Sequence, residues 1–86
     1  MNIYVGNLNF KIKESELQEI FEKYGEVTSV KIITDKHSGR SKGYGFVEME
    51  NDSEAAEAIK GLNGTSVMER EIVVNEARPK RENFRN

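Results

Sequence analysis

The sequence of 86 residues contains no cysteine, and it has only one histidine. Without cysteine neither a disulfide nor a thiolate metal site can stabilise the chain, and nothing indicates an oxidising compartment. No apolar run exceeds three residues, so no segment is long enough to span a membrane. An apparent strand starts at Ile3, which leaves no room for a signal or transit peptide. We therefore expect one small cytoplasmic domain.

The charge of the chain is unevenly distributed. The net charge is −2, yet residues 31–42 carry +3 and residues 77–86 also carry +3, whereas acidic side chains gather in residues 14–26 and 48–57. Such segregation governs how a charged partner is steered and bound, more than the total does. The basic segments fit either a polyanionic partner or two solvated loops.

Hydrophobic periodicity predicts the element order β-α-β-β-α-β. Strands are expected over residues 2–6, 27–34, 43–49 and 71–76, with a connector or short hairpin over 65–69. A helix is expected over 14–24, where the apolar residues have the spacing i, i+3, i+4, i+7, although Lys13 stands where a capping Ser, Thr or Asp is usual. Asp52 or Ser53 is expected to cap a second helix, whose buried face would comprise Ala55, Ala58, Ile59 and Leu62.

The most informative segment is K-G-Y-G-F-V-E-M, residues 42–49. In a strand, Tyr44 and Phe46 share one face, while Gly45, Val47 and Met49 share the other. Taken alone, the segment leaves two interpretations open. The rings are either ordinary core residues or a surface on which nucleobases stack, with a cation beside them for a phosphate.

The element order decides between these interpretations. It is the ferredoxin-like arrangement, an α+β fold in which a four-stranded antiparallel sheet carries both helices on one face. The helices cover only one face, and alternating residues such as Ile3, Val47 and Val74 already occupy it. Tyr4, Tyr44 and Phe46 are therefore expected together on the uncovered face, where an apolar patch indicates a binding partner.

Two motifs carry a resemblance to a known family. Residues 42–49 match seven of the eight positions of the ribonucleoprotein signature K/R-G-F/Y-G/A-F-V-x-F/Y, and residues 3–8, I-Y-V-G-N-L, are similar to its shorter companion hexamer. Over residues 2–78 the chain resembles the RNA recognition motif family, in particular small stand-alone bacterial members. The departure is Met49, which by alternation faces the helices, so it bears on packing more than on RNA contact.

The resemblance implies a role for each site residue. Tyr4 and Phe46 would each stack beneath a base, Tyr44 would pack against the sugars, and Lys42 would pair with a phosphate. Lys31 and Asn75 would flank the bases, and the segment from Asn75 to Arg78 would donate and accept hydrogen bonds at base edges. Arg40 and the tail arginines, Arg78 among them, would contact phosphates. The implied organisation is a binding domain over 1–77 and a basic tail over 78–86. The implied partner is single-stranded RNA, although base stacking would bind single-stranded DNA in the same way. The protein is expected to be a monomer.

Two other functional classes are compatible with this fold. Some family members bind proteins, so the acidic helix surface is an alternative interaction site. Ferredoxin-like folds also host acylphosphatases, which need an arginine at the end of the first strand, where this sequence reads Gly6-Asn7-Leu8-Asn9. Glu48 also stands where a G-x-G-x-x-G motif needs its third glycine, and His37 lies alone in a polar loop. We therefore expect no enzyme, no cofactor and no metal site.

Overall fold

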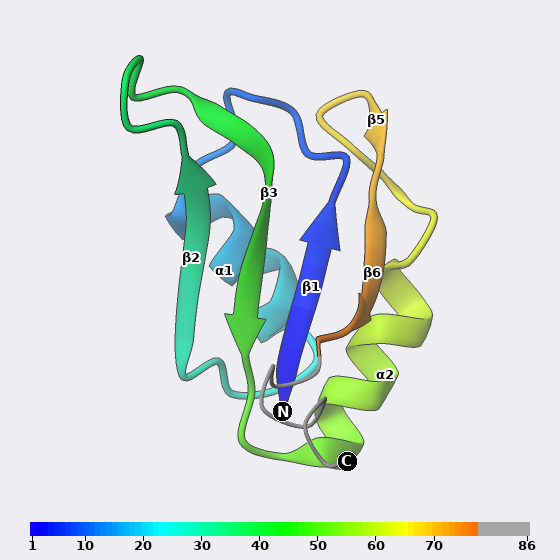
Figure 1. Ribbon diagram of the computed structural model, residues 1–86. Helices are drawn as coiled ribbons and strands as arrows, with labels where there is room; N and C mark the ends of the chain where they lie inside the picture. Colours follow the sequence, from blue (N-terminus) through cyan, green and yellow to red (C-terminus); the bar gives the residue numbers. More distant parts are fainter. Residues whose placement is uncertain (78–86) are drawn as a thin grey trace, which may run out of the picture.

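The computed structural model describes residues 1–77 and forms a two-layer α+β fold (Figure 1). The main strands are β1 (Asn2–Gly6), β2 (Ser29–Thr34), β3 (Ser41–Glu48) and β6 (Val73–Glu76), and they form an antiparallel sheet in the order β2-β3-β1-β6. The helices are α1 (Glu14–Glu22) and α2 (Asp52–Leu62). Strands β4 (Ser66–Val67) and β5 (Arg70–Glu71) form a separate two-stranded hairpin. The predicted fold class is confirmed.

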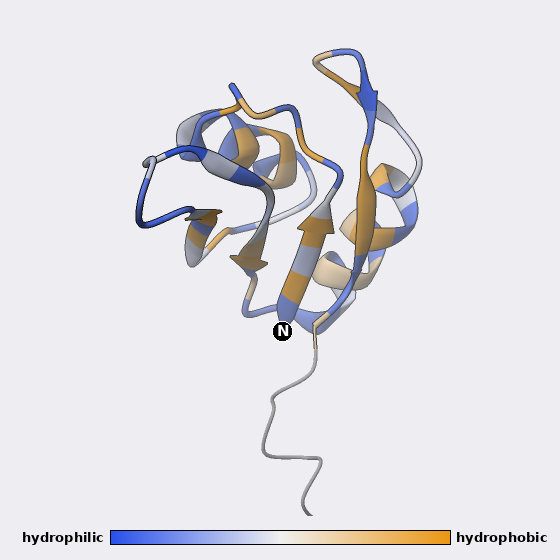
Figure 2. Cartoon of the chain, turned by 45° about the horizontal axis from the view of Figure 1, so that its top comes forward, coloured by the Kyte–Doolittle hydropathy of each residue, from blue (hydrophilic) through white to orange (hydrophobic). Residues whose placement is uncertain are grey.

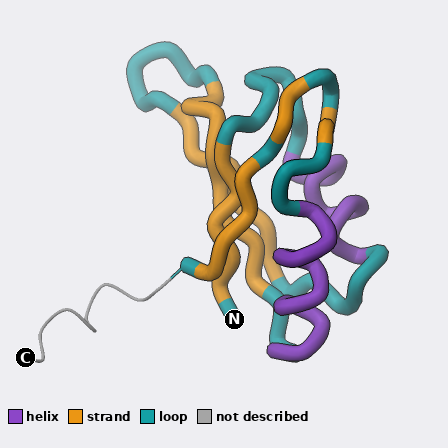
Figure 3. Tube along the Cα trace, turned by 90° about the vertical axis from the view of Figure 1, so that its right-hand side faces the viewer, coloured by secondary structure: helices purple, strands orange, loops and turns teal. Residues whose placement is uncertain are grey.

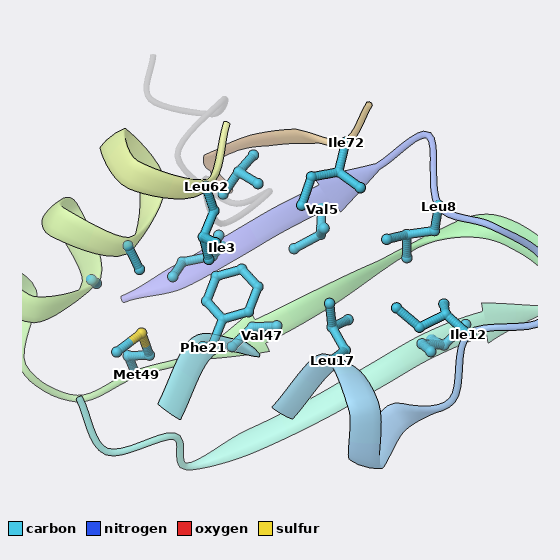
Figure 4. Close-up of a cluster of buried hydrophobic side chains, with 14 residues drawn as sticks. Ile3, Val5, Leu8, Ile12, Leu17, Phe21, Val47, Met49, Leu62 and Ile72 are labelled. Carbon is cyan, nitrogen blue, oxygen red and sulfur yellow. The ribbon is translucent and has the colours of Figure 1, made fainter. Parts of the chain in front are cut away.

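Both helices lie on one face of the sheet, as Figure 3 shows from the side. The core between the layers is entirely apolar among the described residues, and Figure 4 shows Leu17 and Phe21 of α1 pointing at the inward side chains of β1 and β3. Met49 is fully buried, so the one mismatch to the signature is a packing residue. Neither helix within residues 1–77 is long and apolar enough to cross a membrane.

The helix ends differ in detail from the sequence-based expectations. Helix α1 stops at Glu22, and Tyr24 lies half-buried in the turn that follows. At its start the Glu16 carboxylate accepts a hydrogen bond from the Lys13 N–H (2.8 Å), which compensates for the missing capping side chain. The prediction that Asp52 or Ser53 caps α2 was wrong. The cap is Asn51, whose side-chain oxygen accepts a hydrogen bond from the Glu54 N–H (3.0 Å), and α2 begins at the next residue.

The fourth strand of the sheet is shorter than expected. The prediction began it at Glu71, but β6 starts at Val73, and Glu71 belongs to the β4–β5 hairpin. The hairpin turn places Met68 (φ 51°) and Glu69 (φ 69°) in the left-handed region. Two-residue hairpin turns usually use Asn or Gly there, and neither residue stands at these two positions.

Side chains cover the outer edges of the sheet. On β2 the Ile32 N–H donates to the Glu14 carboxylate (2.9 Å), and on β6 the Val74 N–H donates to the Asn63 side chain (2.9 Å). Edge strands with free N–H groups would invite pairing with another strand. One N–H on each edge strand is therefore occupied by a side chain.

Candidate nucleic-acid interface

Strand alternation places the predicted aromatic residues outside the core. Figure 2 shows apolar and polar residues alternating along β1. Ile3 and Val5 are buried, whereas Tyr4 between them is only half-buried. Strand β3 repeats the pattern, with Val47 buried and Phe46 exposed. We call the side of the sheet turned away from the helices the open face.

Four of the predicted site residues form one row across the open face. Phe46 of β3 pairs with Tyr4 of β1, Tyr4 pairs with Asn75 of β6, and Phe46 pairs on its other side with Lys31 of β2. Adjacent strands are about 4.8 Å apart, so the row spans roughly 14 Å. It carries a cation at one end, two rings in the middle and an amide at the other end.

The three rings are packed into one cluster. Their centroids lie 6.0 Å apart for Tyr4 and Tyr44, 5.9 Å for Tyr4 and Phe46, and 6.2 Å for Tyr44 and Phe46. These tilted and edge-to-face arrangements are favourable for aromatic pairs. Because the rings support one another and stand on two central strands, they form a preorganised aromatic surface.

Gly6 leaves the space that this cluster needs. A Cβ atom at Gly6 would lie 2.8 Å from Cε2 and Cζ of the Tyr4 ring, which is closer than nonbonded carbon atoms pack. The Tyr4 ring therefore extends over the glycine, toward the end of the strand. A larger residue at this position would displace the ring.

The charges differ between the two ends of the open face. We call the end where β1 finishes and β3 starts the upper end, as it stands in Figure 1. The exposed cations Lys42 and Arg70 lie there beside an open hollow. At the lower end another hollow is lined by the carboxylates of Glu48, Asp52 and Glu76 together with Met1, whose terminal amine forms a salt bridge with Asp52.

The cations are not neutralised within the described chain. The only salt bridge among residues 1–77 joins the terminal amine of Met1 to Asp52 (3.7 Å). Lys31, Arg40 and Lys42 therefore keep their charge available for a partner. Arg40 lies in the turn between β2 and β3, outside the row. The Asp35 N–H closes this turn by donating to the Arg40 carbonyl oxygen (2.7 Å). Arg78 and the basic tail lie outside the described residues.

Sequence reasoning missed part of this surface. Among residues 1–77, the exposed large apolar side chains are Phe10 (66% exposed), Phe46 (37%), Met68 (40%) and Val73 (41%). Phe10 lies in the loop between β1 and α1, where the sequence pattern predicted neither a helix nor a strand. Arg70 was also overlooked, because its position depends on the β4–β5 hairpin. The one signal in the sequence was a phenylalanine, Phe10, standing between the polar residues Asn9 and Lys11.

The comparisons with known proteins agree on one family. The model of the RNA recognition motif matches residues 3–73. RbpA of Synechocystis sp., named as a candidate RNA-binding protein, is 47% identical over 80 residues, which cover 93% of this chain and 79% of RbpA. The crystal structure of RNA binding protein PG1 is 48% identical with a TM-score of 0.88, covering 92% of this chain and 98% of that one.

A structure with bound ligand is also similar. The Rna15 RNA recognition motif with bound RNA (GU) is 27% identical with a TM-score of 0.81, covering 91% of this chain and 83% of that chain. The fold, the aromatic open face and the match over residues 3–73 lead to the same result. The chain belongs to the RNA recognition motif family.

Proposed function

We propose that the protein binds single-stranded RNA on its open face. The observation that carries the proposal is the row from Lys31 to Asn75, with the rings of Phe46 and Tyr4 at its centre. Single-stranded nucleic acids expose the faces of their bases, and aromatic side chains stack on them with little regard to sequence. The family membership, and the RNA in the Rna15 structure, support the same ligand.

Each site residue receives a role in this proposal. Tyr4 and Phe46 stack one base each, Tyr44 packs against the sugars, and Lys42 pairs with a phosphate. Lys31 and Asn75 flank the bases at the two ends of the row. Further phosphate contacts are assigned to Arg40 and Arg78, the latter in a basic tail over 78–86 that follows a binding domain over 1–77.

The expected affinity is moderate. One base stack contributes about 1–3 kcal/mol, so two stacks supply roughly 2–6 kcal/mol before the strand is ordered. Phosphate contacts add to this, and a dissociation constant on the order of 1 μM, about −8 kcal/mol, is expected. We assign the protein a binding role in the cytoplasm, as a monomer without catalysis, in post-transcriptional regulation or RNA chaperoning.

The test is a titration of fluorescently labelled random-sequence RNA, followed by anisotropy. The Tyr44→Ala, Phe46→Ala double variant removes two rings, and we expect its affinity to fall at least about fivefold, the lower end for one lost stack. The matched control is Glu19→Gln, Glu57→Gln, two exposed helix residues, which should bind like the wild type. Circular dichroism must show that both variants are folded.

The outcomes separate the alternatives. Equal affinity of the wild type and the ring variant would overturn the proposal. An effect confined to the helix variant, measured against a protein partner, would instead favour the acidic helix surface as the binding site. Single-stranded DNA of the same length serves as a third arm, because only contacts to the ribose 2′-hydroxyl distinguish the two ligands.

A further inference from the structure

The chain leaves α2 through a turn with the geometry of a type II β-turn. The turn spans residues 62–65 and is closed by a hydrogen bond from the Thr65 N–H to the Leu62 carbonyl oxygen (3.0 Å). Asn63 has a φ of −61° and a ψ of 125°, and Gly64 has a φ of 84°. A type II turn needs a positive φ at its third residue, which glycine adopts without strain. The turn therefore favours glycine directly after Asn63.

The same two residues fasten the end of α2 to the edge of the sheet. The Asn63 side-chain oxygen accepts a hydrogen bond from the Val74 N–H of β6 (2.9 Å). The Gly64 N–H donates to the Ile72 carbonyl oxygen (2.8 Å). Because Val74 is fully buried, its N–H would lose a partner at some cost if the Asn63 oxygen were withdrawn.

An asparagine that precedes glycine is chemically labile. The backbone nitrogen of Gly64 can attack Cγ of Asn63. An N–Cγ bond forms, the Cγ–Nδ2 bond breaks, and the amide leaves as ammonia with the proton of the Gly64 nitrogen. Water then opens the five-membered succinimide ring at either carbonyl, which gives aspartate or isoaspartate at position 63. Within residues 1–77 every other asparagine precedes a larger residue, whose side chain hinders this attack.

The native turn opposes the reaction in three ways. Ring closure requires the Gly64 nitrogen to eclipse Cβ of Asn63 about the Cα–C bond, and in an L-residue this needs a negative ψ, whereas the observed ψ is 125°. The proton of the attacking nitrogen is held by Ile72, and the side-chain amide is held by Val74. All three constraints end together when residues 72–74 separate from the turn.

We propose that Asn63 and Gly64 form a spontaneous modification site that the native turn protects. Ammonia is lost in molecules where residues 72–74 have separated from the end of α2. An aspartate product keeps an oxygen that can accept from the Val74 N–H. Isoaspartate instead adds a methylene group to the main chain, which shifts Gly64 away from Ile72. Formation of isoaspartate therefore makes a transient opening of β6 permanent.

The first experiment compares deamidation in the folded and the unfolded chain. The wild type is incubated in one buffer with and without denaturing urea and then digested with trypsin. Mass spectrometry follows the conversion of amide to acid in the peptide 61–70. In urea, Asn63 should react faster than Asn7 and Asn51. In the folded protein its reaction should be at least about tenfold slower than in urea, because the open state is seldom populated.

A variant of the turn tests whether local structure sets the rate. Thr65 Oγ1 donates to the Leu62 carbonyl oxygen (2.7 Å), and Thr65→Val removes this bond while keeping the shape of the side chain. Deamidation of the folded variant should be about two- to tenfold faster than that of the wild type, with no change in urea. Thr34→Val, at an exposed position on β2, is the matched control and should follow the wild type. Gly64→Ala, measured only in urea, should slow the chemistry itself.

The consequence for β6 is measured by hydrogen exchange. The isoaspartate form is produced in urea, separated from the aspartate form by chromatography and refolded. The Val74 N–H should exchange at least about tenfold faster in this form than in Asn63→Asp, which should stay close to the wild type.

Four results would overturn the inference. Equal rates in buffer and urea would show that the turn gives no protection, and this comparison depends on no variant. A rate for Asn63 in urea no higher than that for Asn7 would show that the site is not labile. A folded Thr65→Val with the wild-type rate would exclude control by the turn. Equal exchange of Val74 in the isoaspartate form and Asn63→Asp would show that β6 stays attached. None of these measurements uses RNA, so this inference and the proposed function can fail separately.

Discussion

Replacing Gly6 by alanine tests whether the position of the Tyr4 ring, and not only its presence, matters for binding. The added Cβ would overlap the far end of the Tyr4 side chain. Gly6 is not among the residues with positive φ, so its backbone tolerates alanine. The flexible side chain should therefore move while the strand stays in place. The ring would leave the cluster with Tyr44 and Phe46.

The substitution has one consequence for stability and another for binding. For stability, the substitution gains about 0.4–1 kcal/mol by restricting the unfolded chain and loses up to two aromatic pairs of about 0.5–1.5 kcal/mol each. The net change in the free energy of unfolding is then at most about 2.5 kcal/mol. For binding, the displaced ring no longer supports a base, which costs about 1–3 kcal/mol, or roughly 5–150-fold in the dissociation constant.

A double-mutant cycle with Tyr4→Ala is the decisive assay. The wild type, both single variants and the double variant are titrated with the same labelled RNA at one salt concentration, and their folding is checked by thermal unfolding. Gly6→Ala should weaken binding in the wild-type background and have no further effect when Tyr4 is already alanine, because the two changes act through one ring. Additive losses would refute the reasoning, as would undiminished binding by Gly6→Ala alone.

Two further predictions concern stability and charge. Asn51→Ala should lower the free energy of unfolding by about 1 kcal/mol, because it removes the side-chain oxygen to which the Glu54 N–H donates. Ser53→Ala is the matched control. Urea titrations that show equal losses of stability for the two variants would contradict the assignment of Asn51 as the cap. Lys31→Gln and Lys42→Gln should each reduce the salt dependence of RNA binding by about 0.7 in slope with little change in stability, and an unaltered slope in anisotropy titrations would remove that lysine from the phosphate contacts.

The sheet and its aromatic face could be predicted because local patterns determine them. Alternation along β1 and β3 identifies which residues share a face, and a helix pair can cover only one face of the sheet. Together these two facts placed Tyr4, Tyr44 and Phe46 on the open face without any knowledge of distances. The same alternation assigned Met49 to the core, where it is fully buried.

The upper end of the open face could not be predicted because it depends on contacts between distant segments. Arg70 reaches Asn7 across 63 positions of the sequence, and Asn9 reaches Met68 across 59. Neither contact leaves a periodic signal. The hairpin that brings these residues together also turns through Met68 and Glu69 with positive φ, where a sequence rule looks for Asn or Gly. Tertiary hydrogen bonds therefore stabilise a turn that local preference disfavours.

The arrangement of charge explains how a chain of net charge −2 can bind a polyanion. Three carboxylates line the hollow at the lower end, while Lys42 and Arg70 line the hollow at the upper end. We expect a phosphate backbone that crosses the rings to be attracted toward the upper end, because close charges of this kind are only partly screened over a Debye length of about 8 Å at physiological salt. If a strand stacks on Tyr4 and Phe46 as proposed, we expect it to gain more by extending past Tyr44 toward Lys42 and Arg70 than by extending toward Glu48.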